Sequence, residues 1–217
     1  MLALSSASLS QPEVPVAIEL VLALDSSASM NREEFALQIK GIAVAFKDPA
    51  VLKAVGDLAP LGVAVAVTQW GGPGESRIVT PFTHITNATE AKAFGFVVSF
   101  GSRHFSATTT SIATAIEDSV ALIESNGFDG QRRVIDISGD GEDNSGLDLD
   151  AMRGIAKASG VTVNGLAIES EQSGLFEYYQ QHVITGADSF AVQAADFDDY
   201  ARAIREKLLR ELRPLGS

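Results

Sequence analysis

The sequence contains no cysteine and only three histidines. The absence of cysteine excludes disulfides, thiolate metal sites and cysteine nucleophiles. The histidines are widely separated and match no metal-ligand or catalytic-triad spacing, so we expect them on loops or at the surface. The sequence also lacks a Gly-x-x-x-x-Gly-Lys-Ser/Thr phosphate loop, a Gly-x-Ser-x-Gly nucleophile elbow and a Gly-x-Gly-x-x-Gly dinucleotide motif after its first strand. These absences exclude several common enzyme classes.

Basic residues are scarce, because 16 Lys and Arg stand against 28 Asp and Glu, a formal net charge of −12. A chain of this charge repels phosphate backbones, so nucleic acid is not an expected partner. The longest apolar run, residues 14–24, is interrupted by Pro15 and Glu19 and is shorter than the ~20 residues that cross a bilayer. We therefore expect no membrane span. With 46% hydrophobic residues, the chain can bury a sizeable core.

A length of 217 residues favours one domain, which we place at residues 16–212. Residues 1–15 have the small-residue character of the end of a signal peptide but lack a basic start and a full apolar segment. We interpret them as a trimmed leader or a cloning remnant. Residues 213–217 are interpreted as a C-terminal tail.

Short apolar runs alternate with helical patterns along the chain. The runs suit strands that are covered on both faces, and they lie at residues 16–24, 61–70, 133–138 and 161–168. Asn31 and Glu34 form a capping-box pattern at the start of one helix, and Asp196 with Asp199 indicates the start of the last one. Further helices are expected near Thr110 and after Leu149.

Alternating strands and helices predict an α/β fold, a doubly wound, Rossmann-like and mostly parallel sheet with helices on both faces. One segment breaks the alternation. A glycine-rich turn at residues 70–77 leads into residues 78–82, which we expect to form an antiparallel edge strand, because Pro81 is tolerated only near an edge or a strand end.

Oxygen-bearing side chains follow two of the predicted strands. Asp25, Ser27 and Ser29 alternate directly after the first strand, and Asp140 follows the strand at 133–138 beside two glycines. Ligands of doubly wound sheets bind outside the carboxyl ends of the strands, where the winding direction reverses. If the two strands are neighbours, the carboxylates of Asp25 and Asp140 meet there.

Two carboxylates and several hydroxyls, without histidine or thiolate, favour a hard cation over zinc. Mg²⁺, Ca²⁺ and Mn²⁺ all fit such a donor set. Two aspartates neutralise a divalent ion, and an octahedral Mg²⁺ would still have room for water or one outside ligand. An acidic side chain of a partner protein would suit that position.

These segments resemble the metal-ion-dependent adhesion site of von Willebrand factor type A domains. The resemblance rests on Asp25-x-Ser27-x-Ser29, on the residues 110–116 that open a helix, and on Ser138-Gly-Asp140-Gly, and it covers residues 16–212. It implies that the ion is held, directly or through water, by Asp25, Ser27, Ser29, Thr110 and Asp140. Among the three consecutive threonines, only Thr110 places Ala115-Ile116 where the family has a small and an apolar residue. Ser138-Gly139 stands where a Thr directly before Asp-Gly is more usual.

The C-terminal part, residues 164–168 and 196–210, further resembles an uncharacterised bacterial family of predicted exported A domains. This resemblance implies a periplasmic or secreted, monomeric domain whose signal sequence has been trimmed. In related A domains, ligand engagement is linked to movement of the last helix, here residues 196–211.

The predicted function is a divalent-metal-dependent adhesion or assembly module that binds an acidic residue of a protein partner, and not an enzyme. One alternative is a Mg²⁺-dependent phosphoryl-transfer hydrolase of the dehalogenase type, but that chemistry requires a carboxylate where Ser27 stands. The other is an intracellular A-domain subunit of an ATPase-partnered assembly, which the location of the protein would distinguish.

Other patterns are interpreted structurally. The acidic residues at 136–150 are expected to form a solvated face, with a second cation contact left open, and they do not match an EF-hand. Basic residues on the last helix alternate with glutamates, as on a solvated face; they are Arg202, Arg205, Lys207, Arg210 and Arg213. Trp70, Tyr178 and Tyr179 are expected to pack in the interior.

Overall fold

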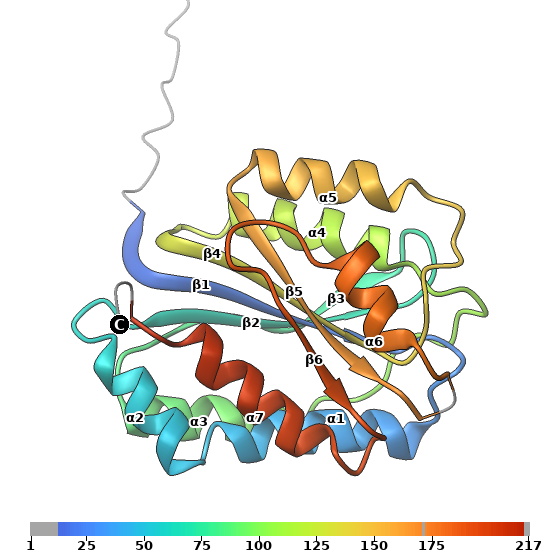
Figure 1. The fold of residues 1–217 in the computed structure, drawn as a ribbon. Helices are drawn as coiled ribbons and strands as arrows, with labels where there is room; N and C mark the ends of the chain where they lie inside the picture. The colour runs from blue at the N-terminus through green and yellow to red at the C-terminus, as the bar shows by residue number, and fades with distance from the viewer. Residues whose placement is uncertain (1–12, 171, 215–217) are drawn as a thin grey trace, which may run out of the picture.

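The computed structural model describes residues 13–170 and 172–214 (Figure 1). A six-stranded sheet in the order β3-β2-β1-β4-β5-β6 is parallel except for the pair β2–β3. Its strands are β1 (Val14–Asp25), β2 (Val63–Trp70), β3 (Ser76–Ile85), β4 (Phe128–Gly139), β5 (Val161–Ile168) and β6 (Ala191–Ala194). The predicted α/β fold with one antiparallel edge strand is confirmed.

Helices cover both faces of the sheet, as Figure 1 shows. One face carries α1 (Arg32–Ala45), α2 (Pro49–Asp57), α3 (Ala88–Val98) and α7 (Tyr200–Glu211). The other carries α4 (Ile112–Glu124), α5 (Leu149–Ala158), α6 (Leu175–Tyr178) and the π-helical turn η1 (Tyr179–Val183). No helix within residues 13–170 and 172–214 is long and apolar enough to cross a membrane.

The apolar runs follow from this two-sided cover. In β1, Leu22 and Leu24 pack into the core beneath α1 and α7, whereas Val21 and Ala23 pack into the core beneath α4. Both faces of the strand are buried, so its sequence is apolar almost throughout. β1 begins at Val14, two residues before the expected domain start, because Val14 and Pro15 pair with the first residues of β4. Residues 1–12 of the expected leader and residues 215–217 of the expected tail lie outside the described residues.

One helix start differs from the sequence prediction. The capping box of Asn31 and Glu34 is present at the start of α1, and α4 begins near Thr110 as expected, with Ser111 as its N-cap. The last helix begins at Tyr200, later than predicted. Asp196 does accept a hydrogen bond from the Asp199 backbone at 2.8 Å, yet the residues between them form a turn, and helical bonding starts only with the Ala203 amide donating to the Asp199 carbonyl.

The interpretation of Lys207 and Asp136 as solvated residues is wrong. Both are fully buried between α7 and β4, where Lys207 Nζ lies 2.9 Å from Asp136 Oδ1 and 2.9 Å from Glu211 Oε1. Asn164 of β5 donates a further hydrogen bond to Glu211 Oε1. The Lys207 ammonium thus compensates the charge of two buried carboxylates. Burial raises the pKa of Asp136 to about 7. The Glu211 carboxylate adds to this increase, whereas the Lys207 ammonium counteracts it.

Candidate metal centre

The two predicted aspartates meet because β1 and β4 are adjacent parallel strands. Leu24 pairs with Ser138, so the loops that follow both strands leave the same edge of the sheet. Asp25 is the last residue of β1, and Asp140 directly follows β4. Ser29 Oγ donates to Asp140 Oδ1 at 2.9 Å and joins the two loops.

Hydrogen bonds connect the other predicted residues to this pair. Asp25 Oδ1 accepts from the Ser27 amide at 2.7 Å, and Ser27 Oγ lies 3.2 Å from Ser29 Oγ. Thr110 Oγ1 donates to Ser27 Oγ at 3.4 Å. The structure therefore brings the side chains of Asp25, Ser27, Ser29, Thr110 and Asp140 into one cluster.

The electrostatics of this cluster suit a cation. Asp25 is fully buried, and its Oδ2 has no hydrogen-bond partner among the described residues. Burial, together with the nearby Asp140 carboxylate, raises the pKa of Asp25 to about 7. A buried carboxylate without a counter-charge is unfavourable, and a bound cation would compensate it. Within residues 13–170 and 172–214 there is no group of three or more His, Asp and Glu that could hold a metal, so a site here depends on hydroxyls as well as carboxylates.

Part of the acidic segment supports the cluster, which corrects its interpretation as a solvated face. Asn144 Oδ1 accepts from the Thr110 amide at 2.7 Å, and the Asn144 amide donates to the Thr110 carbonyl at 3.0 Å. Asp143 Oδ2 accepts from the Ala113 amide in the first turn of α4. These contacts hold the Thr110 loop against the loop after β4. Asp and Asn are common turn residues, so their sequence pattern alone does not reveal this role.

Arg103 is a second residue that the sequence analysis did not identify. Its Nη2 donates to the Ser27 carbonyl at 2.6 Å and its Nε to the Ser26 carbonyl at 3.2 Å. The guanidinium thereby fixes the backbone that carries the Ser27 and Ser29 hydroxyls. Arg103 lies in an irregular segment between α3 and α4, where no periodicity marks it.

Tyr179 packs in the interior as predicted, but its hydroxyl also reaches the cluster. A Cβ placed on Gly139 would stand 2.7 Å from Tyr179 Oη and 3.0 Å from Asp25 Oδ2, so both oxygens border the same point. Neither oxygen has a hydrogen-bond partner among the described residues. The ring lies against Gly165, and Tyr179 opens the π-helical turn η1, a rare element that is frequent at functional sites.

Solved structures with the same fold include proximal thread matrix protein 1 of the mussel byssus, with a TM-score of 0.68 at 14% identity over 92% of this chain and 49% of that one. A second structure of that protein has a zinc-occupied MIDAS motif, with a TM-score of 0.61 at 12% identity over 92% and 46% of the two chains. A von Willebrand factor type A protein from Catenulispora acidiphila gives 0.60 at 15% identity over 91% and 43%. The chain thus spans less than half of each of these proteins.

The strand order and the helices on both faces of the sheet give this chain a von Willebrand factor A-like fold. The chain belongs to the family described as protein of unknown function DUF1194, whose model matches residues 15–215. No curated protein gives a significant match.

Proposed function

We propose that the chain is a metal-dependent protein-binding module. Asp25, Ser27, Ser29, Thr110 and Asp140 would hold one divalent cation directly or through water, and the ion would offer a free coordination position to an acidic side chain of the partner. The observation that carries this proposal is the fully buried Asp25 carboxylate, which lacks a counter-charge beside Asp140 and three hydroxyls. Oxygen donors favour Mg²⁺, Ca²⁺ or Mn²⁺.

The same geometry argues against a hydrolase. A dehalogenase-type enzyme needs a second carboxylate as its general acid and base, and Ser27 occupies the position of that carboxylate. Ser27 Oγ instead lies beside the hydroxyls of Ser29 and Thr110. Neither neighbour is a carboxylate, so the second acid–base group that this chemistry requires is missing from the position of Ser27.

The proposed setting is outside the cytoplasm, with the protein secreted or periplasmic and monomeric. The support is a likeness: one protein of the same fold is a thread matrix protein of the mussel byssus, and its MIDAS motif accepts zinc. Zinc therefore belongs among the ions to be tested, although the donor set here favours harder cations.

Calorimetric titration of the metal-stripped protein with Mg²⁺, Ca²⁺, Mn²⁺ and Zn²⁺ tests the proposal. We expect saturable one-site binding that is lost in Asp25→Ala and weakened in Asp140→Ala. Asp150→Asn is the matched control, because Asp150 lies in the same acidic segment but is exposed and forms an ion pair with Arg153 at the surface. Retention of one-site binding by Asp25→Ala, or its absence from the unmodified protein with every ion, would overturn the assignment.

A further inference from the structure

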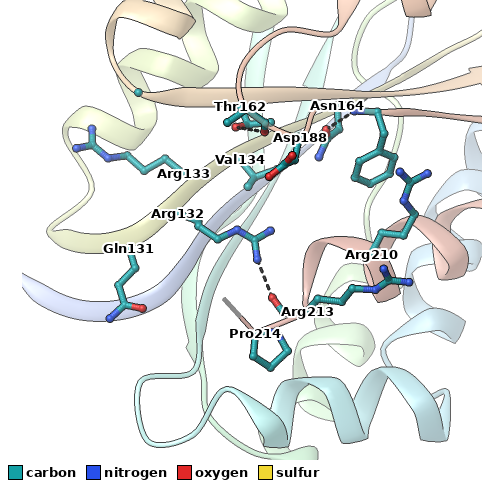
Figure 2. A pocket seen from close by; sticks show the side chains of 13 residues that line it. Gln131, Arg132, Arg133, Val134, Thr162, Asn164, Asp188, Arg210, Arg213 and Pro214 are labelled. Carbon is teal, nitrogen blue, oxygen red and sulfur yellow. Dashed lines mark hydrogen bonds between the residues drawn. The ribbon is translucent and has the colours of Figure 1, made fainter. Parts of the chain in front are cut away.

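A pocket of about 510 Å³ opens at the end of the sheet opposite to the candidate metal centre. The first halves of β4 and β5 line it, together with the loop before β6 and the last residues of α7 (Figure 2). The pocket exists because α7 ends at Glu211 and leaves the start of both strands uncovered on that face. Since β4 and β5 are parallel to β1, their starts lie far from the loops that carry Asp25 and Asp140.

Arginines dominate the pocket. Arg132, Arg133, Arg210 and Arg213 all border it, but Arg133 extends away from the other three (Figure 2). The alternation of side chains along β4 explains this difference, because neighbouring residues of a strand face opposite sides of the sheet. Asp188 is the single acidic residue among the described residues that line the pocket.

The carboxylates of Glu211 and Asp188 interact with the charge of Arg132, but within the part of the chain that the structure describes neither forms an ion pair with it. Arg132 donates to the backbone carbonyls of Glu211 and Arg213, at 2.7 and 2.8 Å, which orients the guanidinium but leaves its charge in place. Arg210 stacks on the Phe190 ring, with its guanidinium carbon 3.7 Å from the ring centre. None of the ion pairs within residues 13–170 and 172–214 includes Arg132, Arg210 or Arg213.

Earlier basic residues of the same helix are all paired. Arg202 pairs with Asp199 and Glu206, Arg205 pairs with Asp48, and Lys207 pairs with two buried carboxylates. The chain has a large excess of acidic residues, with a net charge of −12. Unpaired positive charge is therefore concentrated at the pocket end of α7 rather than spread along the helix.

We infer that this pocket binds an oxyanion, the carboxylate or phosphate group of a small molecule, independently of the metal. The guanidinium fork of arginine matches both groups through paired hydrogen bonds. Stacking on Phe190 holds Arg210 in place and leaves the N–H groups at the edge of its guanidinium plane directed away from the ring. Arg213 supplies a second fork, and Arg132 adds a positive charge that its hydrogen bonds to two backbone carbonyls hold in place.

Calorimetric titration of the metal-stripped protein with citrate and, separately, with inorganic phosphate at constant ionic strength tests this inference. We expect saturable binding of at least one probe, and the preferred probe identifies the group. Arg210→Gln combined with Arg213→Gln should weaken that binding about a hundredfold, because each change removes a charge-assisted hydrogen bond that contributes about tenfold. Arg205→Gln is the control, since Arg205 lies on the same helix but is paired with Asp48.

A variant that is expected to increase probe affinity distinguishes the loss of charge from misfolding, because misfolding can only reduce the affinity. Asp188→Asn removes the negative charge from the pocket, and asparagine tolerates the left-handed backbone of this residue, whose φ is 55°. We expect it to strengthen binding of the preferred probe severalfold. Absence of saturable binding with both probes would overturn the inference, as would equal affinity in the double arginine variant. Loss of probe binding in Asp25→Ala would contradict its independence from the metal centre.

Discussion

Tyr179 is the residue whose role changes most once the tertiary structure is known. Its ring contributes to the core beneath α4 and α5, and its hydroxyl borders the Asp25 carboxylate. Burial and the carboxylates of Asp25 and Asp140 raise the pKa of Tyr179 well above its usual value, so the hydroxyl keeps its proton and remains a donor. A cation that keeps Asp25 ionised would favour a hydrogen bond from Tyr179 to this carboxylate.

Replacement of Tyr179 by phenylalanine should separate packing from positioning. We expect Tyr179→Phe to weaken metal binding about fivefold, which corresponds to roughly 1 kcal/mol for one hydrogen bond. The metal-free variant should be as stable as the unmodified protein or more so, because the change removes a buried hydroxyl without a partner. Metal titration and urea unfolding measure the two effects.

Tyr200→Phe is the control for this experiment. Tyr200 is equally buried, but it lies on the opposite face of the sheet, where its hydroxyl is 3.3 Å from Ser138 Oγ. Its metal affinity should stay within about twofold of that of the unmodified protein, a difference of less than half a kcal/mol. If Tyr179→Phe binds metal as tightly as Tyr200→Phe, the tyrosine serves packing alone.

At the scale of elements, α7 is attached to the sheet by charge as well as by apolar contacts. Ile204 and Leu208 pack in the core, and between them Lys207 contacts Asp136 of β4 and Glu211 of its own helix. A buried ion pair is a weak source of net stability, but loss of one partner is costly because an uncompensated charge remains. The chief role of the Lys207 ammonium is therefore to compensate the charge of the two buried carboxylates beside it.

Lys207→Met should destabilise the protein by about 3–5 kcal/mol at pH 8, where both carboxylates would be left without a counter-charge. The pH dependence gives a second test. Because the pKa of Asp136 is raised to about 7 from 3.8, its contribution to stability is full below about pH 4 and is lost as the pH rises through about 7. Lys207 lowers this pKa, so its removal raises it further. The loss should therefore be smaller at pH 5, where a carboxylate can accept a proton.

Urea unfolding at both pH values measures these losses. Arg202→Met is the control on the same helix, since Arg202 is about half exposed and its ion pairs lie at the surface. It should change the free energy of unfolding by about 1 kcal/mol or less. An equal loss for Lys207→Met at pH 5 and pH 8 would show that packing, rather than charge, explains its effect.

At the scale of the whole molecule, the two candidate sites lie at opposite ends of the sheet. The metal centre gathers carboxylates and hydroxyls where strands end, and the arginine pocket lies where β4 and β5 begin. The loop of the metal centre is tied to β2 as well, because the Ser26 amide and hydroxyl both donate to the Trp70 carbonyl. Binding of a cation should therefore stabilise the fold as a unit and not one loop alone.

Metal addition should raise the free energy of unfolding by about 2.7 kcal/mol at one hundred times the dissociation constant, and chelation should reverse the change. Urea unfolding can follow it through Trp70, which is the single tryptophan and fully buried. Asp25→Ala should show no such increase. An equal increase in that variant would mean that the ion stabilises the protein from elsewhere.

Local patterns were sufficient for much of the fold. The runs at 16–24 and 161–168 correspond to strands buried on both faces, and the glycine-rich turn leads into the antiparallel edge strand β3. Asp25 and Asp140 could be placed together because parallel neighbours end at the same edge of a sheet. The start of α7 was misplaced, because Asp196 suits both the turn that precedes the helix and the helix cap itself.

The sequence by itself determined the order of strands and helices, the antiparallel edge and the oxygen-bearing loops, because each depends on neighbouring residues and on periodicity. The tertiary structure alone decided which polar groups are buried and what they face. Lys207 looks like its exposed neighbours on α7 until β4 supplies Asp136, and Tyr179 looks like packing until Gly139 admits its hydroxyl beside Asp25. Burial and charge compensation arise between segments distant in the chain, and no local pattern encodes them.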